Sequence, residues 1–276
     1  MRPYPNRRTA LTLAGLGTAG ALLSPGAAVA GIRPWTAARS PWVPLWTEDF
    51  THNVARGTFR PNPAGRLVSA ETAPYAERLI AYPDGWRATN GVGIYAPSRS
   101  VSVDSGALTI RCFTDATTGE PVSGAVGTTG SSTYGRWAWR MRGLTTSPGW
   151  NCVCLLWPVD DASWPRSGEI DWPESDLSEQ VKGFYHPAGG RAPTEYVIDG
   201  TGSWADWNDY VLEWTPTSVR YGFNGRIVFS TSTNIPNQPM RWVVQTGEPP
   251  YKPAKRAPGA TAMVQISNLS TWAYRG

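Results

Sequence analysis

Three carboxylate side chains, Glu169, Asp171 and Glu174, lie within six residues of one another in the segment SGEIDWPES, residues 167–175. Charged residues make up only 17% of the sequence, so this concentration of like charge is unusual for the chain. Crowding raises the pKa of at least one carboxyl group, because one negative charge disfavours the next. A neutral carboxylic acid beside an ionised carboxylate is the pair of groups that cleavage of a glycosidic bond requires.

The three side chains can act together only if they reach the same face of a strand. In a strand, Glu169 and Asp171 point to one face and Ile170 to the other. Glu174 is an odd number of residues from Glu169, so a regular strand would send it to the opposite face. One extra residue in a β-bulge restores the shared face, and a proline, which has no N–H for the ladder, is tolerated there. The sequence therefore predicts a bulge at Trp172-Pro173.

The same acids allow two other interpretations, because E-x-D-x-x-E is a loose pattern by itself. They could form a solvated acidic edge or supply oxygen ligands to calcium. Trp157, Trp164 and Trp172 lie close to them in the sequence, and a tryptophan ring packs well on the face of a sugar. We therefore favour a sugar cleft. The spacing allows both the roughly 5–5.5 Å carboxyl separation of retaining glycosidases and the roughly 6.5–9.5 Å separation of inverting ones.

Short runs of β-branched and aromatic residues alternate with Gly, Pro and Asn turns along most of the chain. Residues 100–112 are typical of a hairpin, and Asn224-Gly225 favours a type I′ turn in a second hairpin. Residues 31–276 are therefore expected to form one all-β domain, a jelly-roll sandwich of two antiparallel sheets with an open substrate cleft. Strands are expected at residues 134–142, 151–157, 168–171, 181–186, 210–215, 218–223, 226–231, 240–246 and 262–269, with a lead-in at 31–44 and an irregular loop at 247–259.

Residues 1–30 are typical of a secretory signal peptide, with a basic start, an apolar stretch and the cleavage pattern Ala28-Val29-Ala30. Arg7-Arg8 also resembles a twin-arginine export signal, although an ordinary basic leader would look similar. The apolar stretch is shorter than the about 20 residues that cross a bilayer, so we expect a secreted, extracellular protein without membrane insertion. Without the leader the formal charge of +4 falls to about +1, and the scattered Lys and Arg residues argue against a nucleic-acid partner.

Three cysteines, Cys112, Cys152 and Cys154, leave two arrangements open. Cys152 and Cys154 are poorly placed to pair with each other in an extended strand, but either could form a disulfide with Cys112. Alternatively, all three could be small buried apolar residues. No Cys/His spacing indicates zinc, and with only His52 and His186 available a histidine-based metal site is not expected.

Residues 168–174, GEIDWPE, resemble the signature of glycoside hydrolase family 16, the β-jelly-roll endo-glycanases that include laminarinases, lichenases and agarases. The resemblance covers most of the chain after residue 30, because several motifs occur in the family's order. These motifs are WTEDF at 46–50, YGRWAWR at 134–140, LLWP at 155–158, VKGFYH at 181–186 and WNDYVLEW at 207–214. The extra residue before Glu174 is similar to the bulged, laminarinase-like subgroup, and the Trp-Pro pair is most similar to secreted actinobacterial members.

The resemblance implies a retaining mechanism with Glu169 as nucleophile, Glu174 as general acid/base and Asp171 as the assisting residue. It implies a β-1,3- or mixed β-1,3-1,4-glucan as the polysaccharide substrate, internal cleavage, and no cofactor, and we expect a monomer. Two alternatives stay open. The same acids could serve a transglycosylase or a galactan-type hydrolase, or the jelly roll could be a non-catalytic carbohydrate-binding module.

Further candidates for contact with the sugar are Trp150, Trp164, Trp172, His186, Gln245, Arg140 and Asn90. Each tryptophan could instead belong to the core, and the histidine could be a hydrogen-bonded residue of the sheet. The glutamine is expected to face the cleft, because an amide inside the core would need a partner.

Three positions depart from the family pattern. Cys154 stands where many members have a cleft tryptophan, so one sugar-stacking platform would be missing. Asn208 replaces the usual histidine. Ser267-Asn268 replaces the Asp-Trp pair of the last strand, whose aspartate often helps to hold a structural calcium, so we expect no metal ion.

Overall fold

The computed structural model of the protein describes residues 41–89, 91–198, 202–249 and 256–276, and two β-sheets make up most of it. These residues belong to one compact unit, residues 37–276. The expected signal peptide, residues 1–30, lies outside the described residues. None of the helices in the described ranges combines the length and the apolar character of a membrane span.

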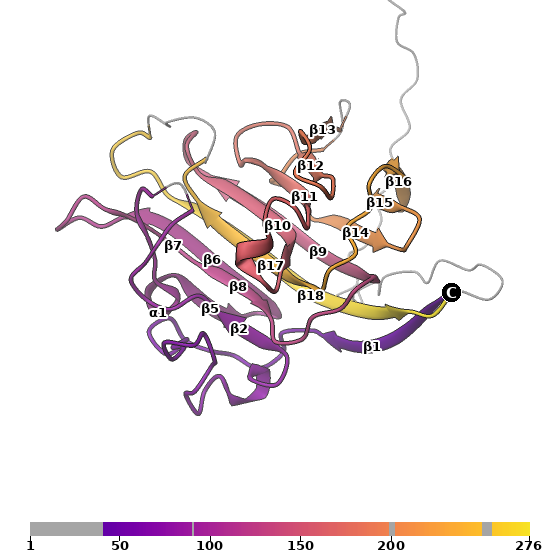
Figure 1. The fold of residues 1–276 in the computed structure, drawn as a ribbon. Coiled ribbons are helices and arrows are strands. Elements are labelled where there is room, and N and C mark those ends of the chain that lie inside the picture. The colour runs from indigo at the N-terminus through magenta and orange to yellow at the C-terminus, as the bar shows by residue number, and fades with distance from the viewer. Residues whose placement is uncertain (1–40, 90, 199–201, 250–255) are drawn as a thin grey trace, which may run out of the picture. The chain divides into compact units, whose positions relative to one another are not determined.

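The first sheet carries eleven strands in the described part of the chain. They are β1 (Trp42–Glu48), β3 (Trp86–Arg87), β4 (Ile94–Tyr95), β5 (Val101–Asp104), β6 (Ala107–Thr114), β7 (Pro121–Ser123), β9 (Gly135–Thr145), β14 (Asn208–Trp214), β15 (Val219–Phe223), β16 (Arg226–Thr231) and β18 (Ala262–Tyr274). Their order is β16-β15-β14-β9-β18-β6-β7-β4-β3, with β1 paired to β18 and β5 paired to β6 (Figure 1).

The second sheet carries seven described strands and holds the acidic segment. They are β2 (Leu79–Ala81), β8 (Ala125–Thr128), β10 (Asn151–Pro158), β11 (Glu169–Asp176), β12 (Lys182–His186), β13 (Thr194–Val197) and β17 (Met240–Gly247), in the order β13-β12-β11-β10-β17-β8-β2. Three short helices complete the described elements: the 3₁₀ helices η1 (Ala73–Tyr75) and η2 (Asp161–Ser163), and α1 (Pro97–Ser100).

The all-β fold with two sheets is confirmed, and both expected hairpins form. The second hairpin joins β15 to β16 through Asn224 and Gly225, whose φ angles of 45° and 83° are those that a type I′ turn requires. Pairing is antiparallel throughout the described ladders except between β4 and β7, which are parallel. The expected pair of antiparallel sheets is therefore present, with one short parallel pair at the end of the first sheet.

The first and the last described strands, β1 and β18, pair with each other, and the strand prediction missed this pairing. β18 continues to Tyr274, and its last residues lie beside β1 (Figure 1). In this ladder Trp42 pairs with Tyr274. Pro44 made residues 31–44 look like an irregular lead-in. The strand nevertheless forms, because the register shifts between Pro44 and Trp46 and the proline sits at that irregularity.

A cluster of aromatic rings fills the space between the sheets. Trp139 of β9 stacks on Tyr210 of β14, with ring centroids 6.0 Å apart, and meets the edge of Trp242 of β17 at 5.6 Å. Trp172 of β11 stacks on Tyr221 of β15 at 5.0 Å and donates its indole N–H to the carbonyl of Gly222. The Trp139–Trp242 and Trp172–Tyr221 contacts join one sheet to the other, so the inner face of β11 is fixed by packing.

The predicted bulge is present in β11. Asp171 pairs with Leu155 of β10, and Glu174 pairs with Val153, so two residues of β11 lie opposite the single residue Cys154. The extra residue changes the parity of the strand, and Asp171 and Glu174 therefore share a face although three positions separate them.

Replacement of Trp172 by alanine should lower the free energy of unfolding by about 3–5 kcal/mol, because it removes a fully buried ring and leaves a cavity. Urea denaturation followed by circular dichroism measures the loss. Trp86→Ala is the matched control: Trp86 is 53% exposed, so its removal should change stability by less than about 1 kcal/mol. Equal losses in the two variants would contradict the assignment of Trp172 to the core.

Candidate active site

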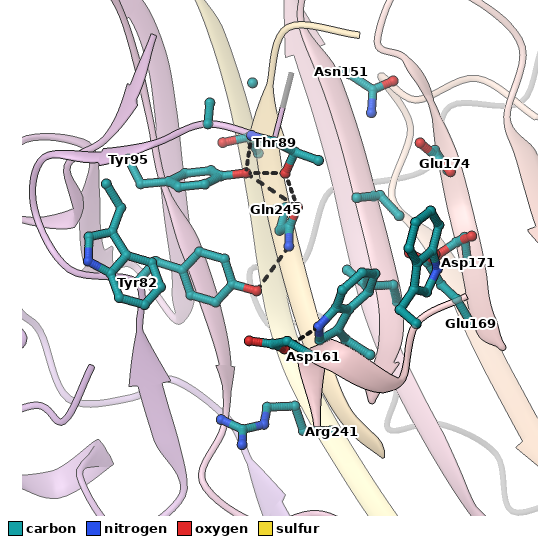
Figure 2. Close-up of a pocket in the computed structure, with 18 of the residues that line it drawn as sticks. Tyr82, Thr89, Tyr95, Asn151, Asp161, Glu169, Asp171, Glu174, Arg241 and Gln245 are labelled. Carbon is teal, nitrogen blue, oxygen red and sulfur yellow. Dashed lines mark hydrogen bonds between the residues drawn. The ribbon is translucent and has the colours of Figure 1, made fainter. Parts of the chain in front are cut away.

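The three acidic side chains of β11 all line one cavity of about 940 Å³. Figure 2 shows Glu169, Asp171 and Glu174 one after another along the same strand. Asp171 is only 2% exposed, and both glutamates are partly buried. Asn151 of the neighbouring strand β10 also lines the cavity, and its side chain hydrogen-bonds to Glu174. The bulge has therefore brought all three carboxyl groups to one surface of the cavity.

His186 stands beside the first two acids, at the end of β12. It pairs with Glu169 in the ladder between β11 and β12. Its Nε2 atom lies 3.1 Å from Oδ2 of Asp171 and 4.0 Å from Oε2 of Glu169. The structure thus places the predicted histidine in the cavity, next to Asp171.

Two tryptophans line the same side of the cavity and are oriented by carboxylates. Trp164 donates its indole N–H to Oε2 of Glu169 at 2.8 Å. Trp157 donates its own N–H to Oδ1 of Asp161 at 2.6 Å. The two rings stack with centroids 5.9 Å apart and an interplanar angle of 25°. Trp164 is 42% exposed, so part of it is available to a ligand.

Burial and mutual repulsion shift the acidity of the whole cluster. Burial, followed by the charge of Asp171, raises the pKa of Glu169 well above its usual range, while His186 and the N–H of Trp164 act in the opposite direction. Burial, followed by the charge of Glu174, also raises the pKa of Asp171. Burial, followed by the charge of Glu169, raises the pKa of Glu174 to about 7. Near neutral pH the cluster therefore offers a proton donor.

A polar network crosses the floor of the cavity at Gln245 of β17. Its Nε2 donates to the hydroxyl of Tyr82 at 3.0 Å, and its Oε1 accepts from Thr89 at 3.1 Å and Tyr95 at 3.3 Å. Figure 2 shows Gln245 between these tyrosines and the acidic side chains. The amide is therefore satisfied and faces the cavity, as predicted. It joins the opposite wall, which is built from residues 80–83, residues 86–89 and Tyr95, to the sheet that carries the acids.

One group in the described part of the chain has the donor atoms to hold a metal ion. Ligand atoms of Glu169, Asp171 and His186 lie within 4.8 Å of one another. Two of these ligands, Glu169 and Asp171, belong to the acidic cluster of β11, so an ion bound here would occupy carboxyl groups that the cluster otherwise offers for proton transfer or nucleophilic attack.

The family model for glycosyl hydrolases family 16 matches residues 95–263, a range that contains β9, β10, β11, β12, β14 and β17. The chain belongs to glycosyl hydrolases family 16. It is accordingly a glycoside hydrolase, and the cavity that contains the three acids of β11 is its candidate active site. A comparison with curated proteins gives no match.

Solved structures of the same architecture share little sequence with this family 16 chain. LamAcat from Zobellia galactanivorans is 16% identical with a TM-score of 0.62, and the alignment covers 83% of this chain and 97% of that one. SCLam, described as a non-specific endo-beta-1,3(4)-glucanase from family GH16, is 16% identical with a TM-score of 0.65, covering 87% and 94%. The Bacillus licheniformis beta-glucanase is 15% identical with a TM-score of 0.58, covering 72% and 93%. These similarities confirm the fold.

Two of the three predicted tryptophan platforms lie elsewhere in this family 16 structure. Trp172 belongs to the core between the sheets, because it follows Asp171 directly and must point to the opposite face of β11. Trp150 is also fully buried, with the guanidinium of Arg256 4.5 Å from its ring centroid. Neither ring lines the cavity. Of the three, only Trp164 is placed to contact a sugar.

Arg140 is not brought to the cavity either. It lies on β9, in the other sheet, and pairs with Asp209 of β14 at 3.0 Å. Its side chain is on the face of that sheet opposite the core residues Trp139 and Met141, so it cannot reach the acids. Asn90 lies outside the described residues.

Cys154 does not mark a missing platform in the cleft. Val153 and Leu155 line the cavity, so Cys154 between them points into the core. The rings that face the cavity from β10 and the following loop are Trp157 and Trp164. Cys154, Cys152 and Cys112 are buried free thiols, so the interpretation as small apolar residues holds and no disulfide forms.

Several cavity residues were missed by sequence reasoning: Tyr82, Trp86, Thr89, Tyr95, Asn151, Asp161 and Arg241. A signal existed for Trp86, an aromatic residue directly after the turn residues Asp84-Gly85, in a segment too rich in turn residues for a long buried strand. A signal existed for Asn151 too, because it shares the parity of Val153 and Trp157 on β10. Arg241 reaches the cavity only through the pairing of β17 with β10.

The raised pKa of Glu174 predicts a pH-dependent stability difference. A carboxyl group whose folded pKa is about 7 stabilises the fold below its ordinary value of 4.5 and loses that contribution as the pH rises through 7. Glu174→Gln removes the buried charge. As the pH rises from 5 to 8, the free energy of unfolding of the variant should therefore increase by about 1–3 kcal/mol relative to that of the wild type, at about 1.36 kcal/mol per pKa unit.

Urea denaturation at the two pH values measures this difference. Glu71→Gln is the control, because Glu71 is exposed and should give no such change. A difference between wild type and Glu174→Gln that is the same at both pH values would show that Glu174 titrates normally.

Proposed function

We propose that the protein is an exported, endo-acting, retaining hydrolase of β-1,3- or mixed β-1,3-1,4-glucan. The observation that carries the proposal is the bulge in β11, which puts Glu169, Asp171 and Glu174 on one face of the strand and inside one cavity. Two carboxyl groups on one surface, one of them with a pKa raised to about 7, have the properties that glycoside hydrolysis uses.

In the first step Glu174 acts as the general acid. It gives its proton to the glycosidic oxygen while the carboxylate of Glu169 attacks the anomeric carbon. The bond from that carbon to the leaving oxygen breaks, and a bond from it to a Glu169 oxygen forms. Glu174 is then left ionised, and the hydrogen bond from Asn151 stabilises that charge.

In the second step water hydrolyses the glycosyl-enzyme. Glu174 takes a proton from the water while the oxygen of that water attacks the anomeric carbon. The electron pair of the ester bond returns to Glu169. This cycle restores both side chains and inverts the anomeric centre twice, so the configuration is retained.

Asp171 is the assisting residue, because its charge lies close enough to Glu169 to raise the pKa of that glutamate. A proton held on Asp171 removes this repulsion and lets Glu169 ionise, and two observations favour that arrangement. Asp171 is the more deeply buried group, so ionising it is less favourable. Glu169 already accepts the N–H of Trp164, which favours its ionised form.

The aromatic residues on both sides of the cavity support a glucan substrate. Trp157 and Trp164 lie near the acids, while Tyr82 and Trp86 belong to the opposite wall of the cavity. Sugar rings bury their apolar faces on such platforms, and several platforms suit internal cleavage of a chain. Related solved structures include a LamA variant in complex with laminaritriose and laminaritetraose, and a SCLam mutant with 1,3-beta-D-cellobiosyl-glucose at its active site.

The proposal predicts the activity of two glutamate variants on laminarin and barley β-glucan. Glu169→Gln should reduce the release of reducing sugar to background, because an amide cannot form the ester. Glu174→Gln should reduce it by about 100- to 10,000-fold, the usual contribution of a general acid/base. Glu71→Gln, far from the cavity lining, should keep wild-type activity. Proton NMR should show the product's β-anomer first.

Other results would redirect the assignment. Equal release by wild type and Glu169→Gln from laminarin, β-glucan, agarose and carrageenan would rule out hydrolysis at this site. Oligosaccharides longer than those supplied would indicate a transglycosylase. Cleavage of agarose or carrageenan alone would indicate a galactan-type hydrolase, and binding without cleavage would indicate a non-catalytic module.

A further inference from the structure

The loop that connects β10 to β11 supplies both a sugar platform and a hydrogen bond to the proposed nucleophile. Trp164 of this loop is 42% exposed in the cavity and donates its indole N–H to Oε2 of Glu169 at 2.8 Å. His186 lies 4.0 Å from the same oxygen, beyond hydrogen-bond distance. An N–H that donates to a carboxylate forms a short, charge-assisted bond with a defined direction. One side chain therefore contacts the space for the sugar and the reacting group.

The loop holds Trp164 in a fixed orientation. Its ring stacks on Trp157, and the N–H of Trp157 is held by Asp161 at 2.6 Å. The side chain of Asp160 caps η2 by accepting from the N–H of Ala162 at 3.2 Å. Each indole thus has one face packed and its N–H directed at a carboxylate, which limits the rotation of both rings.

The loop also re-enters the sheet in a way that only glycine permits. The N–H of Ser167 donates to the carbonyl of Ser163, and the N–H of Gly168 donates to the carbonyl of Pro165, both at 3.1 Å. Gly168 has a φ of +79°, and a Cβ at this position would lie 2.6 Å from the carbonyl oxygen of His186. The next residue is Glu169, so the loop sets the direction from which the nucleophile leaves the backbone.

We propose that Trp164 is a positioning residue for Glu169, which orients its carboxylate and favours its ionised form, and that the Trp157–Trp164 pair couples sugar stacking to the nucleophile. This inference rests on the proposed function of Glu169. The N–H of Trp164 opposes the burial and the Asp171 charge that disfavour ionisation of Glu169. A tryptophan that served only as a platform would not affect the reactivity of Glu169 once the sugar is bound.

Trp164→Phe tests the proposal, because it keeps an aromatic face and removes the N–H. Loss of one hydrogen bond to a charged group should lower kcat by about 10- to 100-fold, while KM changes by less than about threefold. The acidic limb of the pH profile of kcat/KM should move to higher pH, because the N–H that is lost favoured the ionised form of Glu169. The titratable groups that face Glu169 are Asp171 and Glu174 on β11 and His186 on β12, and the substitution leaves all of them in place.

Trp157→Phe is the matched control. It removes an indole N–H from the same stacked pair, but that N–H is bonded to Asp161 and not to Glu169. It should leave the acidic limb unmoved and should change KM more than kcat. Replacement of Trp164 by benzothienylalanine, a bicyclic isostere without the N–H, should reproduce the Trp164→Phe result with stacking area preserved.

A mechanism-based label separates this inference from the proposed function. The dinitrophenyl glycoside of 2-deoxy-2-fluoro-laminaribiose needs no general acid, so intact-mass spectrometry reports the attack of Glu169 alone. Wild type should gain one glycosyl mass at Glu169, and Trp164→Phe should be labelled about 10- to 100-fold more slowly. Labelling at the wild-type rate with an unmoved acidic limb would overturn the inference. Wild type that is never labelled at Glu169 would overturn the proposed function and the inference with it.

Discussion

The extra residue in β11 is the constraint on which the whole site depends. Two residues, Trp172 and Pro173, lie opposite Cys154, and this mismatch turns Glu174 back to the face of Asp171. Trp172 directly follows Asp171, so it points inward by ordinary alternation and stacks on Tyr221 of the facing sheet. The core contact holds the strand in place, and the extra residue beside it completes the acidic surface on the other side.

Bringing three carboxyl groups into one cavity disfavours their ionised forms, and the structure offsets this in different ways for each. Glu169 accepts an N–H from Trp164, and Glu174 accepts a hydrogen bond from Asn151. Asp171 is the most deeply buried, and it faces Nε2 of His186. The remaining unfavourable energy appears as raised pKa values, which leave a proton available at neutral pH. The repulsion among the carboxyl groups in the free protein thus keeps one of them protonated, and the proposed reaction needs this proton donor.

The fold and the acidic cluster could be predicted because they depend on local patterns. Alternation predicted most of the strands, and the parity argument predicted the bulge from the residues between Asp171 and Glu174. The same parity argument, carried through, would have placed Trp172 and Cys154 in the core, since each is adjacent to a cavity-facing residue. The closeness of a residue to the acids in the sequence was a poorer guide to its place in the structure than the face of the strand toward which its side chain points. Trp150 gave no such signal, because it precedes β10 and is buried by contact with the distant Arg256.

The opposite wall of the cavity could not be predicted because it is assembled by long-range pairing. Tyr82 follows β2, which pairs with β8, and β8 pairs with β17, which carries Gln245. Trp86 is placed by a different ladder, in which β3 pairs with β4 and β4 with β7. Gln245 then hydrogen-bonds to Tyr82 and Tyr95 and joins that wall to the sheet that carries the three acids. The acids and the loop that carries Trp164 come from one continuous segment and are positioned by it. The opposite wall comes from the N-terminal part of the chain, so its shape can vary without disturbing the acids, and differences in linkage preference are best sought there.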